Sequence, residues 1–309
     1  PITLPGLGPM SLFEMDCNVT EHFSKHMTSF RSLIEGAQKD STVMFWPFLP
    51  ESSEPFPSEY EYLSIGPQLA AAADDPIGAE KDSSGVIDFL DRCLERDGAH
   101  SVLYICFGSL HLPPTPSQAE LLFDNIEKAG LRVLFGGRVS DPHLVGQEKR
   151  GEKTTRVISE RIAKMGESGM MSPWTPQLRV LQHEAIAFFM NHGGSNSATE
   201  GLVCGVPMII WPNGWDQPFT ANELVKLGVA FELVQPRSGI KKGKRTAGGM
   251  VIEGDDEAFA RELGGIMRLM KGPKGEEMRA RAREVKGLVL EDMRAGRSHQ
   301  TMLDLGHLS

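Results

Sequence analysis

Cysteine is scarce in this sequence, with four among 309 residues. Cys17, Cys93, Cys106 and Cys204 follow no CxxC or metal-like spacing, and the last two lie among apolar or small residues typical of core packing. A disulfide framework or a zinc site would need cysteines at short, defined spacings. This usage is typical of a reducing compartment, and we therefore expect a cytoplasmic protein.

Long apolar runs and a secretory signal are also missing. No stretch approaches the roughly 18 apolar residues of a membrane-spanning helix, and no signal peptide is visible. The chain begins with proline, and its opening PITLPGLGPM is typical of a loop inside a protein. We therefore expect further residues upstream of Pro1, either in the same gene product or as another chain.

Positive charge is in deficit, because 32 Lys and Arg face 41 Asp and Glu, for a net charge of −9. A protein that tracks nucleic-acid phosphates usually carries a basic face, so this balance argues against a nucleic-acid partner. The one basic run, Lys241 to Arg245, lies among glycines and indicates a solvated loop.

Neither a GxGxxG fingerprint nor a GxxxxGKS/T phosphate loop occurs. What is present is 40% apolar content, enough for one large or two ordinary domains. Apolar strand-like segments alternate with helical patterns, which predicts an α/β fold with a doubly wound parallel sheet. The expected strands cover 101–110, 131–135, 169–174, 185–191, 207–212 and 229–234. The expected helices cover 86–96, 117–130, 158–165, 177–183, 196–203 and 219–228, followed by a loop over 235–254 and helices over 255–271, 275–294 and 298–305.

The first part of the chain is less regular. A helix is expected over 20–38, followed by short strands over 42–48 and 61–67. His22 and His26 lie one turn apart on that helix, which is the geometry of a two-histidine metal pair, but no carboxylate motif accompanies them. Ordinary surface or core histidines are the favoured interpretation.

A His-Gly-Gly turn separates the strand over 185–191 from the next helix. Glycines let the backbone turn sharply and let a ligand approach closely. Asn196 and Ser197 then open a helix whose free N–H groups and positive dipole end favour an anion. His192 at the strand end can donate to a phosphate oxygen. The alternative is an ordinary strand–loop–helix corner with a serine N-cap.

Glu200 shares one helical face with Asn196 and Ser197. A carboxylate there can accept from two ribose hydroxyls, as acidic residues do in dinucleotide folds. The same S-x-x-E spacing is also that of a capping box, in which the glutamate serves only the start of the helix.

Four further residues follow predicted strands. Trp174 can stack on a flat base, although tryptophan is more often part of a core. Asp216 and Gln217 can bracket neighbouring sugar hydroxyls, unless Asp216 is the N-cap of the next helix. Ser109 is either a phosphate contact or a turn residue. The carboxyl ends of parallel strands are where α/β folds bind ligands, and all these candidates follow such ends.

The segment from Trp174 to Gln217 resembles the donor-binding signature of the UDP-dependent glycosyltransferases, known as the plant secondary product glycosyltransferase box. The matching residues are W-x-P-Q at 174–177, V-L-x-H at 180–183, H-x-G-x-N-S at 192–197, E-G at 200–201, G-V-P at 205–207, P at 212 and D-Q at 216–217. The similarity extends through 65–67, 89–109 and the C-terminal helices. Ser195 stands where plant members carry tryptophan, which suggests a non-plant relative, fungal or bacterial.

This resemblance implies the two-domain, Rossmann-like GT-B architecture. Residues 1–66 would be the end of the acceptor-binding domain, 67–85 an interdomain linker, and 86–290 the complete donor-binding domain. Residues 291–309 would form a helix that returns to the acceptor domain. The family's general base, a histidine oriented by an aspartate, is expected upstream of Pro1, so no residue of this chain is assigned as catalytic.

The resemblance also implies a role for each donor-site residue. Trp174 would stack on uracil while the backbone of Thr175 reads its edge, and Gln177 and Glu200 would bind the ribose. The diphosphate would be held by the turn and by the helix start, with His192, Gly194, Asn196, Ser197 and Ser109. Asp216 and Gln217 would bind the sugar, and a final glutamine leans towards glucose.

The activity implied is inverting transfer of a hexose from a UDP-sugar, as co-substrate, to a hydroxyl of a small phenolic, flavonoid, terpenoid or lipid-like acceptor. No DxD motif is seen, so we expect neither a metal nor a cofactor. This chain alone is expected to bind UDP with little turnover. The alternative is a non-catalytic UDP-sugar-binding subunit or fragment that needs a separate N-terminal chain. A transferase acting on lipid-linked cell-wall precursors is disfavoured by the complete W-x-P-Q to D-Q box.

Overall fold

The computed structural model describes residues 43–46, 61–64, 66–67, 84–108, 115–137, 148–214, 216–237, 239–246 and 248–306. The predicted helix over 20–38, with His22 and His26, lies outside these residues. The phosphate candidate Ser109 lies outside them as well.

Six parallel strands form the main sheet, in the order β5-β4-β3-β6-β7-β8. They are β3 (Val102–Cys106), β4 (Arg132–Gly136), β5 (Gly169–Ser172), β6 (Ile186–Asn191), β7 (Met208–Ile210) and β8 (Ala230–Glu232). Each overlaps a predicted strand, because a continuous apolar run is typical of a strand covered on both faces. The strand predicted over 101–110 ends at Cys106, since the chain turns at Gly108 with a φ of 71°. The predicted α/β fold is confirmed.

The sheet changes its direction of growth beside β3. From β3 the chain adds β4 and β5 on one side, and it then returns to add β6, β7 and β8 on the other. β3 and β6 are adjacent parallel strands. The connections that leave their carboxyl ends therefore diverge, and this is the point at which open α/β sheets accommodate ligands.

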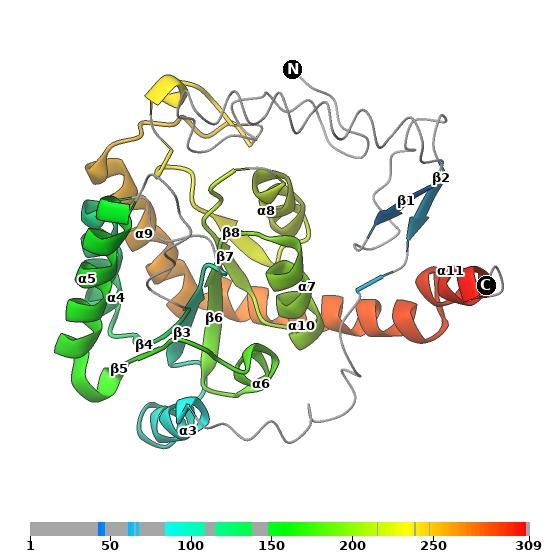
Figure 1. Cartoon of the computed structure of the whole chain (residues 1–309), viewed down its shortest axis with the longest axis horizontal. Coiled ribbons are helices and arrows are strands. Elements are labelled where there is room, and N and C mark those ends of the chain that lie inside the picture. Colours follow the sequence, from blue (N-terminus) through cyan, green and yellow to red (C-terminus); the bar gives the residue numbers. More distant parts are fainter. Residues whose placement is uncertain are drawn as a thin grey trace.

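Helices cover both faces of the sheet (Figure 1). They are α3 (Val86–Asp97), α4 (Pro116–Ala129), α5 (Glu148–Met165), α6 (Gln177–Gln182), α7 (Ser195–Cys204), α8 (Gln217–Lys226), α9 (Asp256–Lys271), α10 (Pro273–Ala295) and α11 (Arg297–Gly306). The loop predicted over 235–254 contains a short 3-10 turn at Gly239–Lys241.

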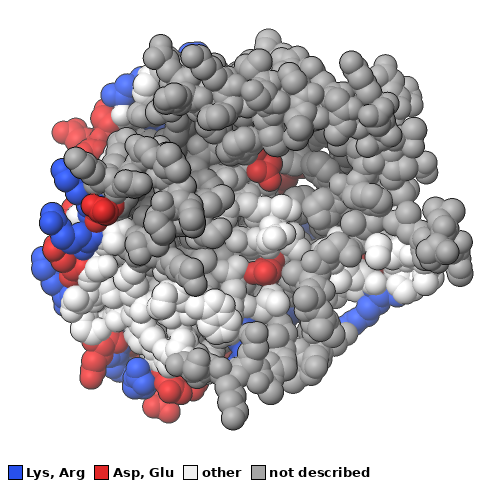
Figure 2. Space-filling view, viewed as in Figure 1, with Lys and Arg blue, Asp and Glu red and all other residues white. Residues whose placement is uncertain are grey.

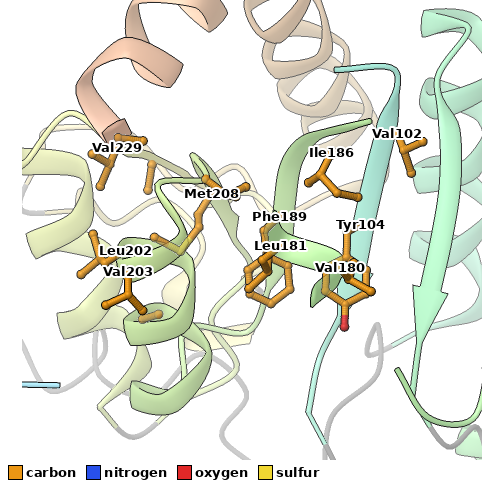
Figure 3. Packing of buried hydrophobic residues seen from close by; sticks show 14 of the residues in the cluster. Val102, Tyr104, Val180, Leu181, Ile186, Phe189, Leu202, Val203, Met208 and Val229 are labelled. Carbon is orange, nitrogen blue, oxygen red and sulfur yellow. The ribbon is translucent and has the colours of Figure 1, made fainter. Parts of the chain in front are cut away.

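The core has two parts, one on each face of the sheet. One buried cluster joins the sheet to α3, α6, α7, α8 and α10, and the other joins it mainly to α4, α5 and α9. Successive residues of a strand point to opposite faces, so Tyr104 belongs to the first cluster and Ile105 to the second. Figure 3 shows the ring of Tyr104 beside Phe189, with its hydroxyl pointing away from the apolar side chains. The two rings stack with centroids 5.0 Å apart.

Helix α5 is longer than its sequence pattern predicts, because it begins at Glu148 and not at Ile158. Its described buried residues include Thr154, Ile158 and Ile162, and a polar residue within such a stripe weakens the periodic signal. Ion pairs to α4 support it from the outside. Arg161 binds Glu120 at 2.8 Å, Asp124 at 2.7 Å and Glu127 at 2.9 Å. Figure 2 shows basic and acidic side chains interleaved on this side of the molecule.

The C-terminal helices extend towards the first part of the chain. Strands β1 (Val43–Trp46) and β2 (Glu61–Ser64) form a separate parallel pair within the segments predicted as strands. α11 contacts β2, and Ser298 at its start lies against Gly66. Figure 1 shows α10 leading away from the main sheet and α11 ending near β2. The division of the chain into an acceptor part, a linker and a donor part stays a prediction.

Candidate functional site

Most of the predicted site residues lie along one edge of the main sheet, where its parallel strands end. Trp174, Thr175 and Gln177 follow β5, His192 to Glu200 follow β6, and Asp216 and Gln217 follow β7. The end of β3 adjoins the turn after β6, because a Cβ at Gly108 would lie 3.0 Å from Cε1 of His192. The structure therefore brings residues from four strand ends to one edge, on both sides of the change in strand order.

A buried tyrosine contacts two of these residues. Tyr104 donates from its phenol to Gln177 Oε1 at 2.9 Å, and the phenol oxygen lies 2.7 Å from Thr175 Oγ1. Burial raises the pKa of Tyr104 well above its ordinary value, so the phenol keeps its proton. Tyr104 was not among the site residues that the sequence motifs indicated. A signal was available, since a tyrosine in a strand buried on both faces needs a partner for its hydroxyl.

Glu200 stands at the end of this hydrogen-bonded chain. Gln177 Nε2 donates to Glu200 Oε2 at 2.5 Å. Burial raises the pKa of the Glu200 carboxyl, and the hydrogen bond from Gln177 lowers that pKa by a smaller amount. α7 begins at Ser195, so Glu200 is in its second turn and cannot reach back to the helix start. The capping-box interpretation is therefore wrong, and a half-buried carboxylate remains at the sheet edge.

Trp174 projects from the protein, with 50% of its surface exposed. Its carbonyl oxygen accepts a hydrogen bond from Ser172 Oγ at 2.5 Å, which fixes the backbone directly after β5. The core interpretation of this tryptophan is thereby excluded. A large apolar ring held in solvent beside a polar cluster is suited to stack on a flat ligand.

The turn after β6 is built from two glycines. Gly193 has a φ of 83°, and its N–H donates to Asn191 Oδ1 at 2.8 Å. A Cβ at Gly193 would lie 2.7 Å from Ile210 Cγ2, and one at Gly194 would overlap the His192 imidazole. Any larger residue at either position would therefore disturb the turn or the imidazole.

The start of α7 has no side-chain cap. Its N-cap residue is Gly194, whose lack of a side chain leaves the first helical N–H groups without an intrahelical acceptor. The serine N-cap interpretation is wrong, because Ser195, Asn196 and Ser197 all lie within the helix. The helix start, with its partial positive charge, adjoins His192 and is suited to bind an anion.

Gln217 is buried, and its side-chain oxygen is hydrogen-bonded to the loop that precedes it. Its Oε1 accepts from the N–H groups of Asn213 at 2.8 Å and Gly214 at 3.3 Å. A ligand would therefore meet its Nε2 amide, which can only donate. Asp216 is the N-cap residue of α8 by position, but its side chain makes no capping bond and is exposed. The carboxylate of Asp216 is therefore placed to meet a ligand from solvent.

His183 has a structural role in its turn. Its Nδ1 accepts from the N–H of Ala185 at 3.1 Å, and its Nε2 lies 3.1 Å from Asp91 Oδ1 on α3. These contacts tie the end of α6 to the start of β6 and to α3. Within the residues that the structure describes, no group of three or more His, Cys, Asp and Glu side chains could hold a metal ion. The helices of that same part of the chain include none long and apolar enough to cross a membrane.

Comparison with known families gives a match over the centre of the chain. Residues 82–258 match the model of a family described as "UDP-glucoronosyl and UDP-glucosyl transferase". UDP-glycosyltransferase eriJ of Hericium erinaceus is 31% identical over 212 residues, which is 67% of this chain and 40% of that protein. Zeatin O-glucosyltransferase of Phaseolus lunatus is 29% identical over 236 residues, or 74% of this chain and 47% of that protein. This chain thus spans less than half the length of these relatives.

Solved structures share the fold at low sequence identity. UGT2 of Phytolacca americana, complexed with UDP-2fluoro-glucose and pterostilbene, has a TM-score of 0.66 and 22% identity. That match covers 100% of this chain and 62% of that chain. A UDP-glucose: anthocyanidin 3-O-glucosyltransferase in complex with UDP has a TM-score of 0.60 and 21% identity, over 85% of this chain and 52% of that chain.

Proposed function

Because this chain belongs to the UDP-glucoronosyl and UDP-glucosyl transferase family, we propose that the carboxyl edge of its main sheet binds a UDP-sugar for transfer to a small hydroxylated acceptor. One observation carries the proposal. The exposed Trp174 and the half-buried Glu200 lie on the same sheet edge as the uncapped start of α7. A nucleoside diphosphate requires three features of its site: a flat ring for its base, a hydrogen-bond acceptor for its ribose hydroxyls and an anion site for its diphosphate.

The proposed roles follow from what each group can accept or donate. Trp174 stacks on uracil and the backbone of Thr175 contacts its edge, while Glu200 accepts from the ribose hydroxyls beside Gln177. The diphosphate lies against the turn and the helix start, contacted by the remaining polar groups there. These are His192, Gly194, Asn196 and Ser197, with Ser109 as a further candidate. Asp216 and the Nε2 amide of Gln217 contact the sugar, which we propose to be a hexose and specifically glucose.

The donor half of the site would contribute to catalysis by stabilising the leaving group. As the acceptor hydroxyl attacks the anomeric carbon, the bond to the diphosphate breaks and negative charge develops on UDP. N–H groups at the start of α7 and the His192 imidazole would face that charge in the fold as it stands, so they would stabilise the transition state without reorganisation. We propose an inverting reaction without a metal, and a cytoplasmic protein in keeping with the free thiols of Cys93, Cys106 and Cys204.

Calorimetric titration of the 309-residue chain with UDP tests the donor site. His192→Ala and Glu200→Ala should each weaken UDP binding about tenfold, the usual cost of losing a charged hydrogen bond. Two control substitutions lie elsewhere, His299→Ala on α11 and Glu160→Ala on the exposed side of α5, and both should leave the dissociation constant unchanged. Unchanged affinity in both site variants would overturn the assignment. Addition of EDTA should have no effect on UDP binding.

A second candidate function takes account of the length comparison, in which the chain matches 40–47% of two curated relatives. In this alternative the chain is a UDP-sugar-binding subunit that acts only with a separate N-terminal chain. The two are distinguished by assaying the purified chain with UDP-glucose and a phenolic acceptor, after mass spectrometry for a second polypeptide. Turnover by the pure chain would exclude the subunit interpretation.

A further inference from the structure

We propose that Tyr104 is a positioning residue of the donor site, whose buried hydroxyl sets the amide orientation of Gln177 and thereby aligns Glu200 for the ribose. The inference rests on the proposed binding of UDP. Tyr104 itself is fully buried in β3, and it acts through its neighbours.

The direction of each hydrogen bond is fixed by the group at the end of the chain. A carboxylate can only accept, so the side of Gln177 that faces Glu200 must be its Nε2 amide. The Oε1 atom of Gln177 then faces Tyr104 and accepts its single phenolic proton, at 2.9 Å. Thr175 Oγ1, at 2.7 Å from the phenol, must therefore donate to Tyr104.

The result is one ordered series of donors that runs from Thr175 through Tyr104 and Gln177 to Glu200. Hydrogen bonds in series polarise one another when they are shielded from water. Oε2 of Glu200 accepts from Gln177, so in the proposal Oε1 is the oxygen that a ribose hydroxyl meets. Without the phenol, the Gln177 amide could rotate and present its oxygen to the carboxylate, which would repel it.

The packing around the phenol leaves it little freedom. Its ring stacks on Phe189 with an interplanar angle of 11°. On the other side is Gly136, where a Cβ would lie 3.0 Å from Thr175 Oγ1 and 3.1 Å from Tyr104 Cε2. The absence of a side chain at the end of β4 thus makes room for the contact between Thr175 and Tyr104.

Tyr104→Phe removes only the hydroxyl and keeps the stacked ring. We expect the dissociation constant of UDP to rise about five- to tenfold, as for the loss of a hydrogen bond in a charged network. The preference for UDP over 2′-deoxy-UDP should shrink by about threefold or more, because the effect is exerted through the ribose contact. Thr154→Val, which removes a buried hydroxyl on α5, is the matched control and should leave both quantities unchanged.

A double-mutant cycle separates positioning from a general structural effect. If Tyr104 acts through Glu200, then Tyr104→Phe should have little further effect on UDP binding in a Glu200→Gln background. Gly136→Ala places a methyl group against Thr175 and Tyr104 and so disturbs their contact while the phenol is kept. It should also reduce the preference for UDP over 2′-deoxy-UDP. The Gly136→Ala variant replaces Tyr104→Phe in the test if circular dichroism shows that Tyr104→Phe does not fold.

The outcomes separate the inference from the function on which it rests. Wild-type chain that does not bind UDP would overturn both. Wild-type chain that binds UDP but does not prefer it to 2′-deoxy-UDP would overturn the ribose contact, and with it the role of Tyr104. Wild-type preference that persists unchanged in Tyr104→Phe and Gly136→Ala, or additive effects in the cycle, would overturn the role of Tyr104 alone.

Discussion

At the scale of single residues, the two glycines after β6 have different tasks. Gly193 needs a backbone conformation with a φ of 83°, and it also lacks room for a side chain beside Ile210. Gly194 has an ordinary φ of −65°, and what limits it is the His192 imidazole. A methyl group should therefore strain the fold at Gly193 and displace the His192 imidazole at Gly194.

Because of this difference, two neighbouring substitutions should affect different properties, one the stability of the fold and the other the affinity for UDP. Gly193→Ala should lower the free energy of unfolding by about 2 kcal/mol or more, from a left-handed alanine and a steric overlap. Gly194→Ala should nearly preserve stability but weaken UDP binding about tenfold, because the imidazole can move aside. Chemical denaturation and calorimetry measure the two effects. Gly265→Ala on α9, where a Cβ meets nothing within 4 Å, is the control and should stabilise the chain by about 0.5–1 kcal/mol. Full UDP affinity in Gly194→Ala would contradict the placement of His192.

At the scale of elements, a carboxylate ties α9 to the segment that follows β8. Glu262 accepts from the N–H groups of Val234 and Gln235, both at 2.9 Å. Burial raises its pKa from 4.5 to about 7, although these two hydrogen bonds lower it. The folded protein therefore holds a proton there at a pH where the unfolded chain has already released it.

This proton makes the stability of the fold depend on pH. Between the unfolded value of 4.5 and the folded value of about 7, the folded state binds more protons, so the contribution of Glu262 to the free energy of unfolding decreases as pH rises. The full decrease is roughly 3 kcal/mol. Glu262→Gln cannot titrate and should flatten this part of the profile, measured by urea unfolding at several pH values. Glu257→Gln, exposed on the same helix, should keep the wild-type slope. An unchanged slope in Glu262→Gln would refute the assignment.

The elements themselves were predictable to the extent that their apolar pattern was strong. All six strands of the main sheet were predicted, and the central ones, β3 and β6, carry the longest apolar runs. Helix α5 was predicted too short, because the buried residue one turn before Ile158 is the polar Thr154, which gives no apolar signal. The start of α7 was predicted one residue late, since a glycine N-cap gives no polar signal of the kind that serine gives.

At the scale of the whole molecule, the proposed donor site joins elements that are distant in the chain. Tyr104, Gln177 and Glu200 come from β3, α6 and α7, so their contacts exist only when the sheet is complete. A ligand that binds these contacts therefore binds the folded state alone, and its binding energy adds to the stability of the fold.

UDP should accordingly stabilise the chain against unfolding. At a free concentration about one hundred times its dissociation constant, the gain is about 2.7 kcal/mol. Thermal denaturation of the 309-residue chain with and without UDP measures it, and Glu200→Gln at the same UDP concentration should gain less. A wild-type transition that UDP does not shift would contradict a donor site formed by this chain alone.

The sequence by itself determined the fold class, the family and most of the donor-site candidates. Apolar strands that alternate with helices have few stable arrangements, and the residues from Trp174 to Gln217 carry their resemblance in linear order. Only the tertiary structure decided between the local alternatives, by exposing Trp174 and placing Glu200 beyond the start of α7. It also supplied the hydrogen bonds on which the proposed role of Tyr104 rests, because a local pattern cannot identify partners that lie 71 and 73 positions away.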